Sequence, residues 1–235
     1  MNKILHALQE LKEGRPILVY DSEGREEETD IVVPADFATP ELVRMLRSDG
    51  GGLLCLAIHP EIANKLGIPF LTDVWKDAIS KYPVFEEVWP NDIPYDEKSS
   101  FSITINHRDT FTGITDNDRS LTITELARLG ENILKNEYMV GDFGREFRSP
   151  GHVILLRAAE GLLKNRKGHT ELSVALMEMA GLTPMTAICE MLGSDGNSLR
   201  IADSKEYAKR NGLAFIEGKE AIETFLSGEI TPLTK

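Results

Sequence analysis

The stretch PILVYDSEGREEETDIVVPA, residues 16–35, places an acidic segment between two apolar ones. PILVY (16–20) and IVVPA (31–35) predict two buried strands, because each is a short apolar run containing β-branched residues. Between them, seven of the ten residues of DSEGREEETD (21–30) carry a charge, and six of these are acidic. The segment is either a solvated turn or a metal or proton-transfer site at the mouth of a sheet.

Helix-like and strand-like segments interleave along the rest of the chain. Short apolar runs predict further strands at 53–58, 101–105, 152–159, 185–192 and 213–216. Periodic apolar residues predict helices at 1–14, 39–52, 60–67, 121–134, 169–182, 203–212 and 219–226. No internal repeat or linker-like shift in composition interrupts this pattern. We therefore predict a single α/β (α+β-like) domain over residues 1–235, with a mixed sheet flanked by helices.

Local signals give two helices more detail and leave one region without a regular pattern. Leu5, Leu8 and Leu11 form the expected apolar stripe of the first helix. Asp203 and Glu206 stand in capping-box positions at the start of the predicted helix 203–212. Residues 69–100 have mixed composition and weak periodicity, and they predict an irregular excursion with one helix at 74–82. Excursions of this length are uncommon in a compact domain unless they are functional.

Composition and charge restrict the class of partner. The chain has 235 residues, 41% hydrophobic composition and a formal net charge of −12. A surplus of negative charge disfavours nucleic acid and anionic membranes as partners. The N-terminal segment is amphipathic and unlike a signal peptide, and no apolar run is long enough to span a bilayer. Cys55 and Cys189 lie in apolar runs, so we expect free, buried thiols in a cytoplasmic protein.

The acidic segment could hold a divalent cation. In an extended loop, side chains alternate with a period of two, so Glu26, Glu28 and Asp30 would share one side and Glu27 the other. Three converging carboxylates repel one another unless a cation or a shared proton compensates. Oxygen ligands favour magnesium or manganese. Alternatively, Arg25 pairs with one carboxylate and water solvates the rest.

RKGHTE (166–171) has the features of an anion site at a helix N-terminus. Thr170 stands at the start of a predicted helix, Gly168 allows close approach of the backbone to a ligand, and Arg166 supplies a bidentate cation. His169 lies between these groups. A lone histidine is more often structural, and the flanking arginine, glycine and threonine make a functional role about as plausible here.

Three further segments carry candidates for proton transfer and binding. In SPGHV (149–153), Pro150 and Gly151 predict a turn that places His152 at the start of a strand, as an acid–base group or a structural histidine. Glu190 interrupts the apolar run AICEML (187–192), so either the strand is half exposed there or the carboxyl points into a pocket with a shifted pKa. TGITDNDRS (112–120) predicts a polar loop that could bind sugar hydroxyls or be a simple turn. Together the segments indicate a metal-dependent enzyme that acts on a small phosphorylated sugar, and they leave isomerase, aldolase and lyase open.

These segments also carry a resemblance. REEETD, EKSSFSITI, TGITDNDR, FRSPGHV, RKGHTE and AICE, in this order, resemble the 3,4-dihydroxy-2-butanone 4-phosphate synthases of riboflavin biosynthesis, in particular the archaeal single-function type. The resemblance runs over residues 4–199. It implies a lyase that converts D-ribulose 5-phosphate to 3,4-dihydroxy-2-butanone 4-phosphate and formate through a metal-stabilised enediol, with Mg²⁺ (or Mn²⁺) as cofactor. It also implies a cytoplasmic homodimer with active sites near the subunit interface.

The same resemblance implies roles for individual residues. Glu26 and His169 match metal ligands. Substrate contacts are implied for Arg25, Glu26, Asp30, Arg166, Lys167, Gly168, His169, Thr170 and Glu190. Catalytic roles are implied for His152, Glu190, Glu28 and Asp21, and Cys55 resembles an active-site neighbour. Two features depart from the common bacterial pattern, which are Thr29 in place of a glycine and the longer 69–100 excursion.

Two rival functions make different predictions. A metal-dependent pentose-phosphate isomerase, which also uses an enediol, would give a sugar phosphate and no formate. A calcium-binding module would bind metal without turnover, and the joint presence of an anion site and proton-transfer candidates disfavours it.

Overall fold

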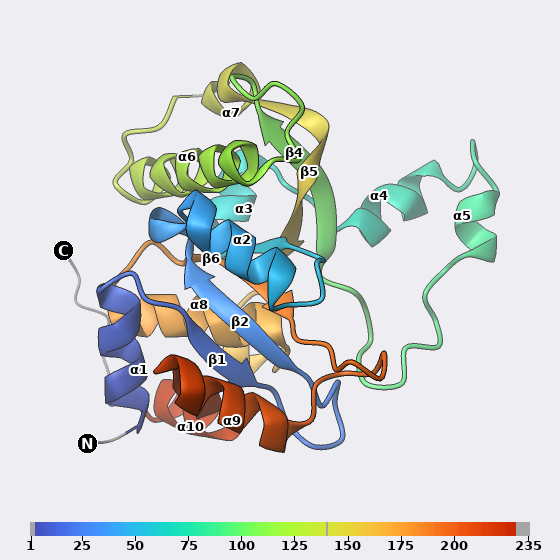
Figure 1. Cartoon of the computed structure of the whole chain (residues 1–235). Helices are drawn as coiled ribbons and strands as arrows, with labels where there is room; N and C mark the ends of the chain where they lie inside the picture. Colours follow the sequence, from blue (N-terminus) through green and yellow to red (C-terminus); the bar gives the residue numbers. More distant parts are fainter. Residues whose placement is uncertain (1–2, 140, 229–235) are drawn as a thin grey trace.

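The computed structural model describes residues 3–139 and 141–228 (Figure 1). Seven strands within these residues form one sheet in the order β4-β5-β3-β6-β2-β1-β7. Their bounds are β1 Ile17–Tyr20, β2 Thr29–Pro34, β3 Cys55–Ile58, β4 Phe101–His107, β5 Phe147–Arg157, β6 Met185–Glu190 and β7 Ala214–Glu217. The pairs β1/β7 and β3/β5 are parallel and the other neighbouring pairs are antiparallel. The predicted mixed sheet is confirmed.

Alternation along the central strands divides the apolar side chains between two cores. Leu18, Ile31 and Val33 are buried on one face of the sheet, whereas Val19 and Val32 are buried on the other. Helices α2 (Pro40–Ser48), α3 (Pro60–Leu66), α6 (Asp116–Leu134) and α9 (Ile201–Asn211) contribute to the first core. Helices α1 (Lys3–Lys12), α8 (His169–Ala180) and α10 (Gly218–Ser227) contribute to the second. The sheet is therefore covered by helices on both faces, as Figure 1 shows.

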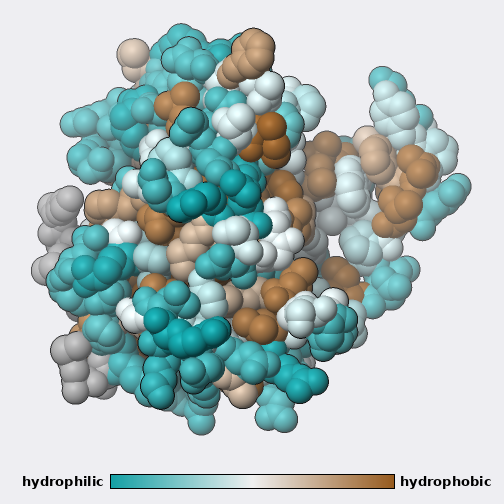
Figure 2. All heavy atoms as spheres, viewed as in Figure 1, coloured by the Kyte–Doolittle hydropathy of each residue, from teal (hydrophilic) through white to brown (hydrophobic). Residues whose placement is uncertain are grey.

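The remaining short helices lie in the connections. They are η1 Ala35–Phe37, α4 Leu71–Ala78, α5 Val84–Glu87, α7 Asp142–Glu146 and η2 Leu162–Lys164. The helix expected at 74–82 begins and ends earlier, as α4, and α5 and α7 were not predicted because each spans little more than one turn. The α4–α5 arm projects from the body (Figure 1). It exposes the large side chains of Val74, Tyr82, Val84 and Val88, and Figure 2 shows brown, hydrophobic surface on this arm.

Two predicted loops are regular structure. The segment 116–120, expected within a polar loop, forms the first turns of α6, because the Thr115 hydroxyl caps the helix by accepting the backbone N–H of Asp118. Pro150 and Gly151, expected to form a turn, lie inside the continuous strand β5. The ladder makes room for them by a shift in register, since Ile105 pairs with Val153 but Asn106 pairs with Arg148.

The capping box predicted for the ninth helix is wrong. Helix α9 begins at Ile201, two residues earlier than expected, so Asp203 lies in its first turn and no side chain caps the N-terminus. A capping box is present instead at α10, between Glu217 and Glu220.

Both cysteines are free and buried, as predicted. Cys55 packs in the core that contains α8, and Cys189 packs in the opposite one. Among the described residues, no helix has the length and apolar character needed to cross a membrane.

The predicted stripe of α1 needs one correction, and it yields a stability test. Leu5 is 51% exposed, whereas Leu8 is 4% exposed and packs with Ile4 and Leu11. We expect Leu8→Ala to lower the free energy of unfolding by about 2–4 kcal/mol, through lost burial and a residual cavity. Leu5→Ala is the matched control, with an expected change below about 0.5 kcal/mol. Urea denaturation of both variants decides, and equal losses would contradict the observed orientation of α1.

Candidate active site

A cavity of about 120 Å³ lies where several parts of the fold meet. Asp30 at the start of β2 and Glu190 at the end of β6 are paired across the antiparallel ladder. His169 and Thr170 at the N-terminus of α8 and Glu26 of the acidic loop also line it. Most of the remaining wall is the end of the 69–100 excursion, here called the return segment (residues 93–100). The structure thus brings residues far apart in the sequence to one end of the central strands.

The acidic loop is a compact turn rather than an extended strand connection. The Asp21 carboxylate accepts the backbone N–H groups of Glu26 at 3.0 Å and Glu28 at 3.1 Å. Glu27 has a positive φ of 57°. The expected alternation is therefore wrong, because hydrogen bonds to a buried aspartate fold the loop back. Glu28 accepts a hydrogen bond from the Ser198 hydroxyl at 2.6 Å and does not line the cavity.

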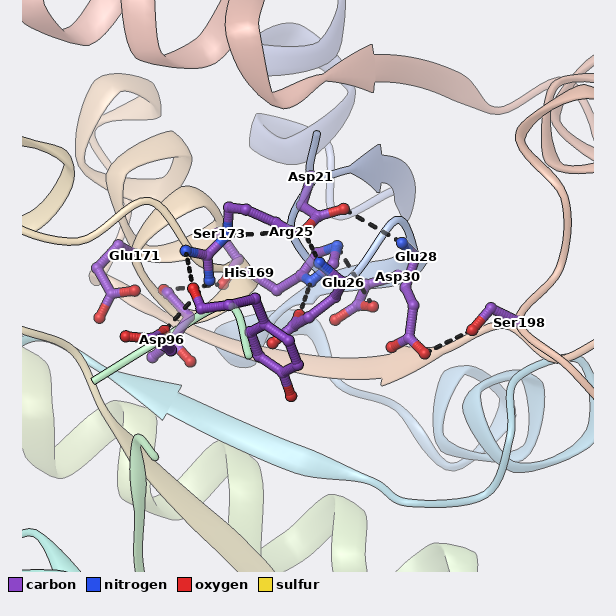
Figure 3. Close-up of polar contacts among 12 residues, drawn as sticks. Asp21, Arg25, Glu26, Glu28, Asp30, Asp96, His169, Glu171, Ser173 and Ser198 are labelled. Carbon is purple, nitrogen blue, oxygen red and sulfur yellow. Dashed lines mark hydrogen bonds and ion pairs between the residues drawn. The ribbon is translucent and has the colours of Figure 1, made fainter. Parts of the chain in front are cut away.

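His169 is the centre of the acidic cluster (Figure 3). Its Nδ1–H donates to Glu26 Oε2 at 2.9 Å, and its Nε2 lies 3.6 Å from Asp30 Oδ1. Burial by itself would lower the pKa of His169. The negative charges of Asp30, Glu26 and Asp21 outweigh burial and raise the pKa to about 10. Burial raises the pKa of Glu26, and the hydrogen bond and charge of His169 bring it below its usual value. The cluster is thus held together by one imidazolium among several carboxylates.

Two buried atoms of this cluster have no hydrogen-bond partner. They are Nε2 of His169 and Oδ1 of Asp30, both facing the same space. Donor atoms of Asp21, Glu26 and His169 also lie within 4.8 Å of one another. Orphaned polar atoms are costly in a folded protein, and a set of carboxylate oxygens with one imidazole nitrogen suits a divalent cation. These residues therefore fit a Mg²⁺ or Mn²⁺ site.

Glu190 is half-buried at the edge of the cavity. Burial raises its pKa, and the charges of Glu28 and Glu26 add to the rise. Burial raises the pKa of Asp30 well above its usual value as well. Both alternatives for Glu190 are realised, because the strand is half-exposed at this residue and its side chain also lines the cavity with a raised pKa.

Arg166 reaches the cavity but is already paired. Its Nη1–H donates to Glu171 Oε2 at 2.5 Å, and its Nε–H donates to Asp96 Oδ2 at 2.7 Å. A Cβ on Gly168 would lie 2.4 Å from Arg166 Nη1. The group that approaches the backbone of Gly168 closely is thus the Arg166 guanidinium of the same chain. The sequence predicted a close approach at this glycine but could not show that Arg166 makes it. Lys167 is exposed and does not line the cavity.

Arg25 joins the same cluster from the acidic loop. Its Nη2–H donates to Asp96 Oδ2 at 3.2 Å, and its Nε lies 3.7 Å from Asp21 Oδ2. The alternative in which Arg25 pairs with an acidic-loop carboxylate is therefore partly realised. Its shorter contact, however, is to Asp96 of the return segment.

His152, like Glu28 and Lys167, does not line this cavity. It is exposed on β5, where its backbone N–H donates to Asn106 Oδ1 at 2.8 Å and its Nδ1 lies 3.1 Å from Asn106 Nδ2. Cys55 is 2% exposed and packed in a core, and burial raises its thiol pKa, so it is not a reactive group.

Several residues that shape the cavity were not among the candidates from the sequence. They are Tyr95, Asp96, Lys98 and Glu171. Asp96 lies about 70 residues before Arg166, in a segment without periodicity, so no local pattern links the two. Glu171 follows His169 in the RKGHTE segment, yet its role appears only once its carboxylate is seen to hold Arg166.

The fold and the cavity define the class: an α/β enzyme whose pocket combines residues that fit a divalent cation with a guanidinium suited to an anion. The sequence model of 3,4-dihydroxy-2-butanone 4-phosphate synthase matches residues 5–224. A protein of that name from Methanothermobacter thermautotrophicus is 51% identical over 224 residues, which are 95% of this chain and 96% of the relative. Another from Archaeoglobus fulgidus is 53% identical over 224 residues, covering 93% of this chain and 92% of the relative. The chain belongs to the 3,4-dihydroxy-2-butanone 4-phosphate synthase family of riboflavin biosynthesis.

A solved structure agrees with the fold. The crystal structure of a 3,4-dihydroxy-2-butanone 4-phosphate synthase in complex with two magnesium ions matches with a TM-score of 0.73 at 26% identity. The match covers 96% of this chain and 97% of that one.

Proposed function

We propose that this chain converts D-ribulose 5-phosphate to 3,4-dihydroxy-2-butanone 4-phosphate and formate. The observation that carries the proposal is a single cavity that joins the Glu26–His169 pair, the Arg166 guanidinium and the titratable Glu190. The high identity to relatives with this name supports the same reaction.

Glu26 and His169 would hold a magnesium or manganese ion, as the closeness of their donor atoms allows. A homologue crystallised with two magnesium ions supports the choice of metal. When bound, such a cation polarises the oxygens of the sugar and stabilises an enediolate. His169 must give up its proton to act as a ligand. Asp30 Oδ1 lies 3.6 Å from His169 Nε2, close enough for the Asp30 carboxylate to balance the positive charge that Glu26 leaves on the cation.

The phosphate of the substrate would bind at Arg166 and the N-terminus of α8. Gly168, His169 and Thr170 begin this helix, whose backbone N–H groups and dipole favour an anion. Lys167 is exposed beside it and adds positive charge without lining the cavity. Arg25, Glu26 and Asp30 would contact the sugar.

Glu190 and His152 would share the acid–base steps. The raised pKa of Glu190 keeps its carboxyl closer to a proton-exchanging range than that of a surface glutamate. Both carboxylate oxygens of Asp21 accept hydrogen bonds from the backbone of the acidic loop. We therefore expect Asp21 to position Glu26 rather than to exchange protons. Glu28, bonded to Ser198, would likewise hold the loop that excludes water from the site.

His152 would reach the cavity from a second copy of the chain. It is exposed and outside the cavity of its own subunit. Its partner Asn106 also donates to the backbone oxygen of Thr112, in the loop that carries the exposed side chains of Phe111 and Ile114. Exposed apolar groups on a loop linked to a candidate catalytic histidine support a homodimer with active sites at the interface.

Carbon NMR with uniformly labelled ribulose 5-phosphate tests the reaction. With magnesium we expect a formate signal and a four-carbon phosphate, and with EDTA neither signal. New pentose-phosphate signals without formate would replace the proposal with the isomerase. Metal binding without any change in substrate would leave a binding module.

A further inference from the structure

The edge of Arg166 that suits a phosphate is occupied by a carboxylate of the same chain. Asp96 Oδ2 lies 2.7 Å from Arg166 Nε and 2.7 Å from its Nη2, which together form the bidentate edge of the guanidinium. Arg25 Nη2 donates to the same oxygen at 3.2 Å. Three guanidinium nitrogens from two arginines thus surround one oxygen, as they would surround an oxygen of a bound phosphate.

The two carboxylates that hold Arg166 differ in how firmly they are fixed. Glu171 is fully buried in α8, and its Oε1 accepts the backbone N–H of Ala159 at 2.8 Å. Asp96 belongs to the return segment, which has neither helix nor strand, and its Oδ1 accepts only the adjacent backbone N–H of Glu97. Glu171 therefore anchors the guanidinium, whereas Asp96 can leave it by a movement of a loop.

We propose that Asp96 is a carboxylate latch that occupies the anion-binding edge of Arg166 and Arg25 until the phosphate of the substrate displaces it. The inference deepens the proposed function and rests on it for the identity of the anion. Asp96 then determines specificity, although it makes no bond to the reacting carbons.

Competition from Asp96 affects the binding of carboxylates more than the binding of phosphates. Because Asp96 is tethered, its effective concentration at the two arginines is high, on the order of millimolar or more. A free monocarboxylate offers these arginines nothing beyond what Asp96 supplies. A phosphate monoester brings a charge of about −1.5 to −2 and three acceptor oxygens, so it can engage both guanidinium groups and the helix N-terminus at once.

A merely structural role for Asp96 predicts the opposite effect on phosphate binding. If Asp96 served to orient Arg166 for the ligand, its removal would weaken binding. A latch competes with the ligand, so its removal strengthens binding. The sign of the change separates the two roles.

The test is calorimetric titration of the intact chain with inorganic phosphate, in EDTA and at fixed ionic strength. We expect Asp96→Asn to lower the dissociation constant roughly tenfold, because one charge-assisted interaction no longer competes. Glu97→Gln removes the same charge from an exposed neighbour and should change it less than about twofold. Asp96→Ser must repeat the gain, which covers the event that the asparagine variant fails to fold.

Further variants show whether the gain passes through Arg166. Adding Arg166→Gln to Asp96→Asn should abolish the gain in phosphate affinity. In the single variant Asp96→Asn, the preference for phosphate over acetate should be smaller than in wild type. Unchanged or weaker phosphate binding in both Asp96 variants overturns the latch, as does an absence of phosphate binding in wild type and variants alike. Because this readout needs no turnover, failure of the proposed reaction shows separately, as missing formate.

Discussion

Replacement of Glu26 by glutamine is expected to lower magnesium-dependent formate release roughly 10²–10³-fold. Glu26 contributes one of the few charged oxygens near His169, and its carboxylate is the hydrogen-bond partner of the imidazole at 2.9 Å. Lewis-acid stabilisation of an enediolate contributes several kcal/mol to a barrier, and each ~1.4 kcal/mol is a factor of ten in rate. Glutamine keeps the shape and the hydrogen-bond acceptor but removes the charge that a cation requires.

The measurement is formate release together with magnesium affinity from calorimetry. Glu23→Gln is the matched control, since Glu23 is an exposed acid of the same loop and carries the same change of charge. We expect that control to keep most of its activity. Wild-type turnover and metal affinity in Glu26→Gln would exclude Glu26 from the ligand set.

Complementation between two inactive subunits is expected to restore activity if His152 acts across the dimer. Glu26→Gln and His152→Ala, each alone, should be nearly inactive. A heterodimer of the two, isolated with two different tags, would contain one doubly altered site and one intact site. It should recover about half of the wild-type activity, because a two-fold dimer has two equivalent sites.

A second heterodimer gives the reciprocal result. Wild type paired with the double variant Glu26→Gln/His152→Ala should be nearly inactive, because each of its two sites lacks one group. If His152 instead served the cavity of its own subunit, this heterodimer would keep about half of the activity and the first would stay inactive. Either pattern assigns the histidine to a subunit.

The sheet and most of its helices follow from local signals. Apolar runs identified β1, β2, β3 and β6 because these central strands are buried on both faces and need no alternation. An apolar run also identified the edge strand β7, in which burial alternates. The residue at which a strand begins or ends was predicted less reliably than the existence of the strand. Proline and glycine predict a turn in SPGHV, but the partner strand β4 accommodates them by a change in register, which is a tertiary effect.

Part of the site follows from residue type and part depends on contacts over long separations. Glu26, His169, Arg166 and Glu190 were candidates because a charged group in or beside an apolar element needs a reason to be there. Asp96 gave no such signal, because an acidic residue in an irregular exposed segment is ordinary in sequence. Its significance depends on the path of the excursion from α5 back to β4, which local spacing does not encode.

The pairing of Asp30 with Glu190 across β2 and β6 sets a limit on how stable this chain can become. Like charges opposite each other on neighbouring strands weaken a ladder, and burial raises the pKa of both carboxyls. Consensus design or directed selection for heat resistance would therefore favour neutral residues at these two positions, where stability is gained at the expense of the pocket. Engineering for higher thermal stability should leave this end of the sheet unchanged. Stabilising substitutions are better sought elsewhere, for example on the exposed α4–α5 arm.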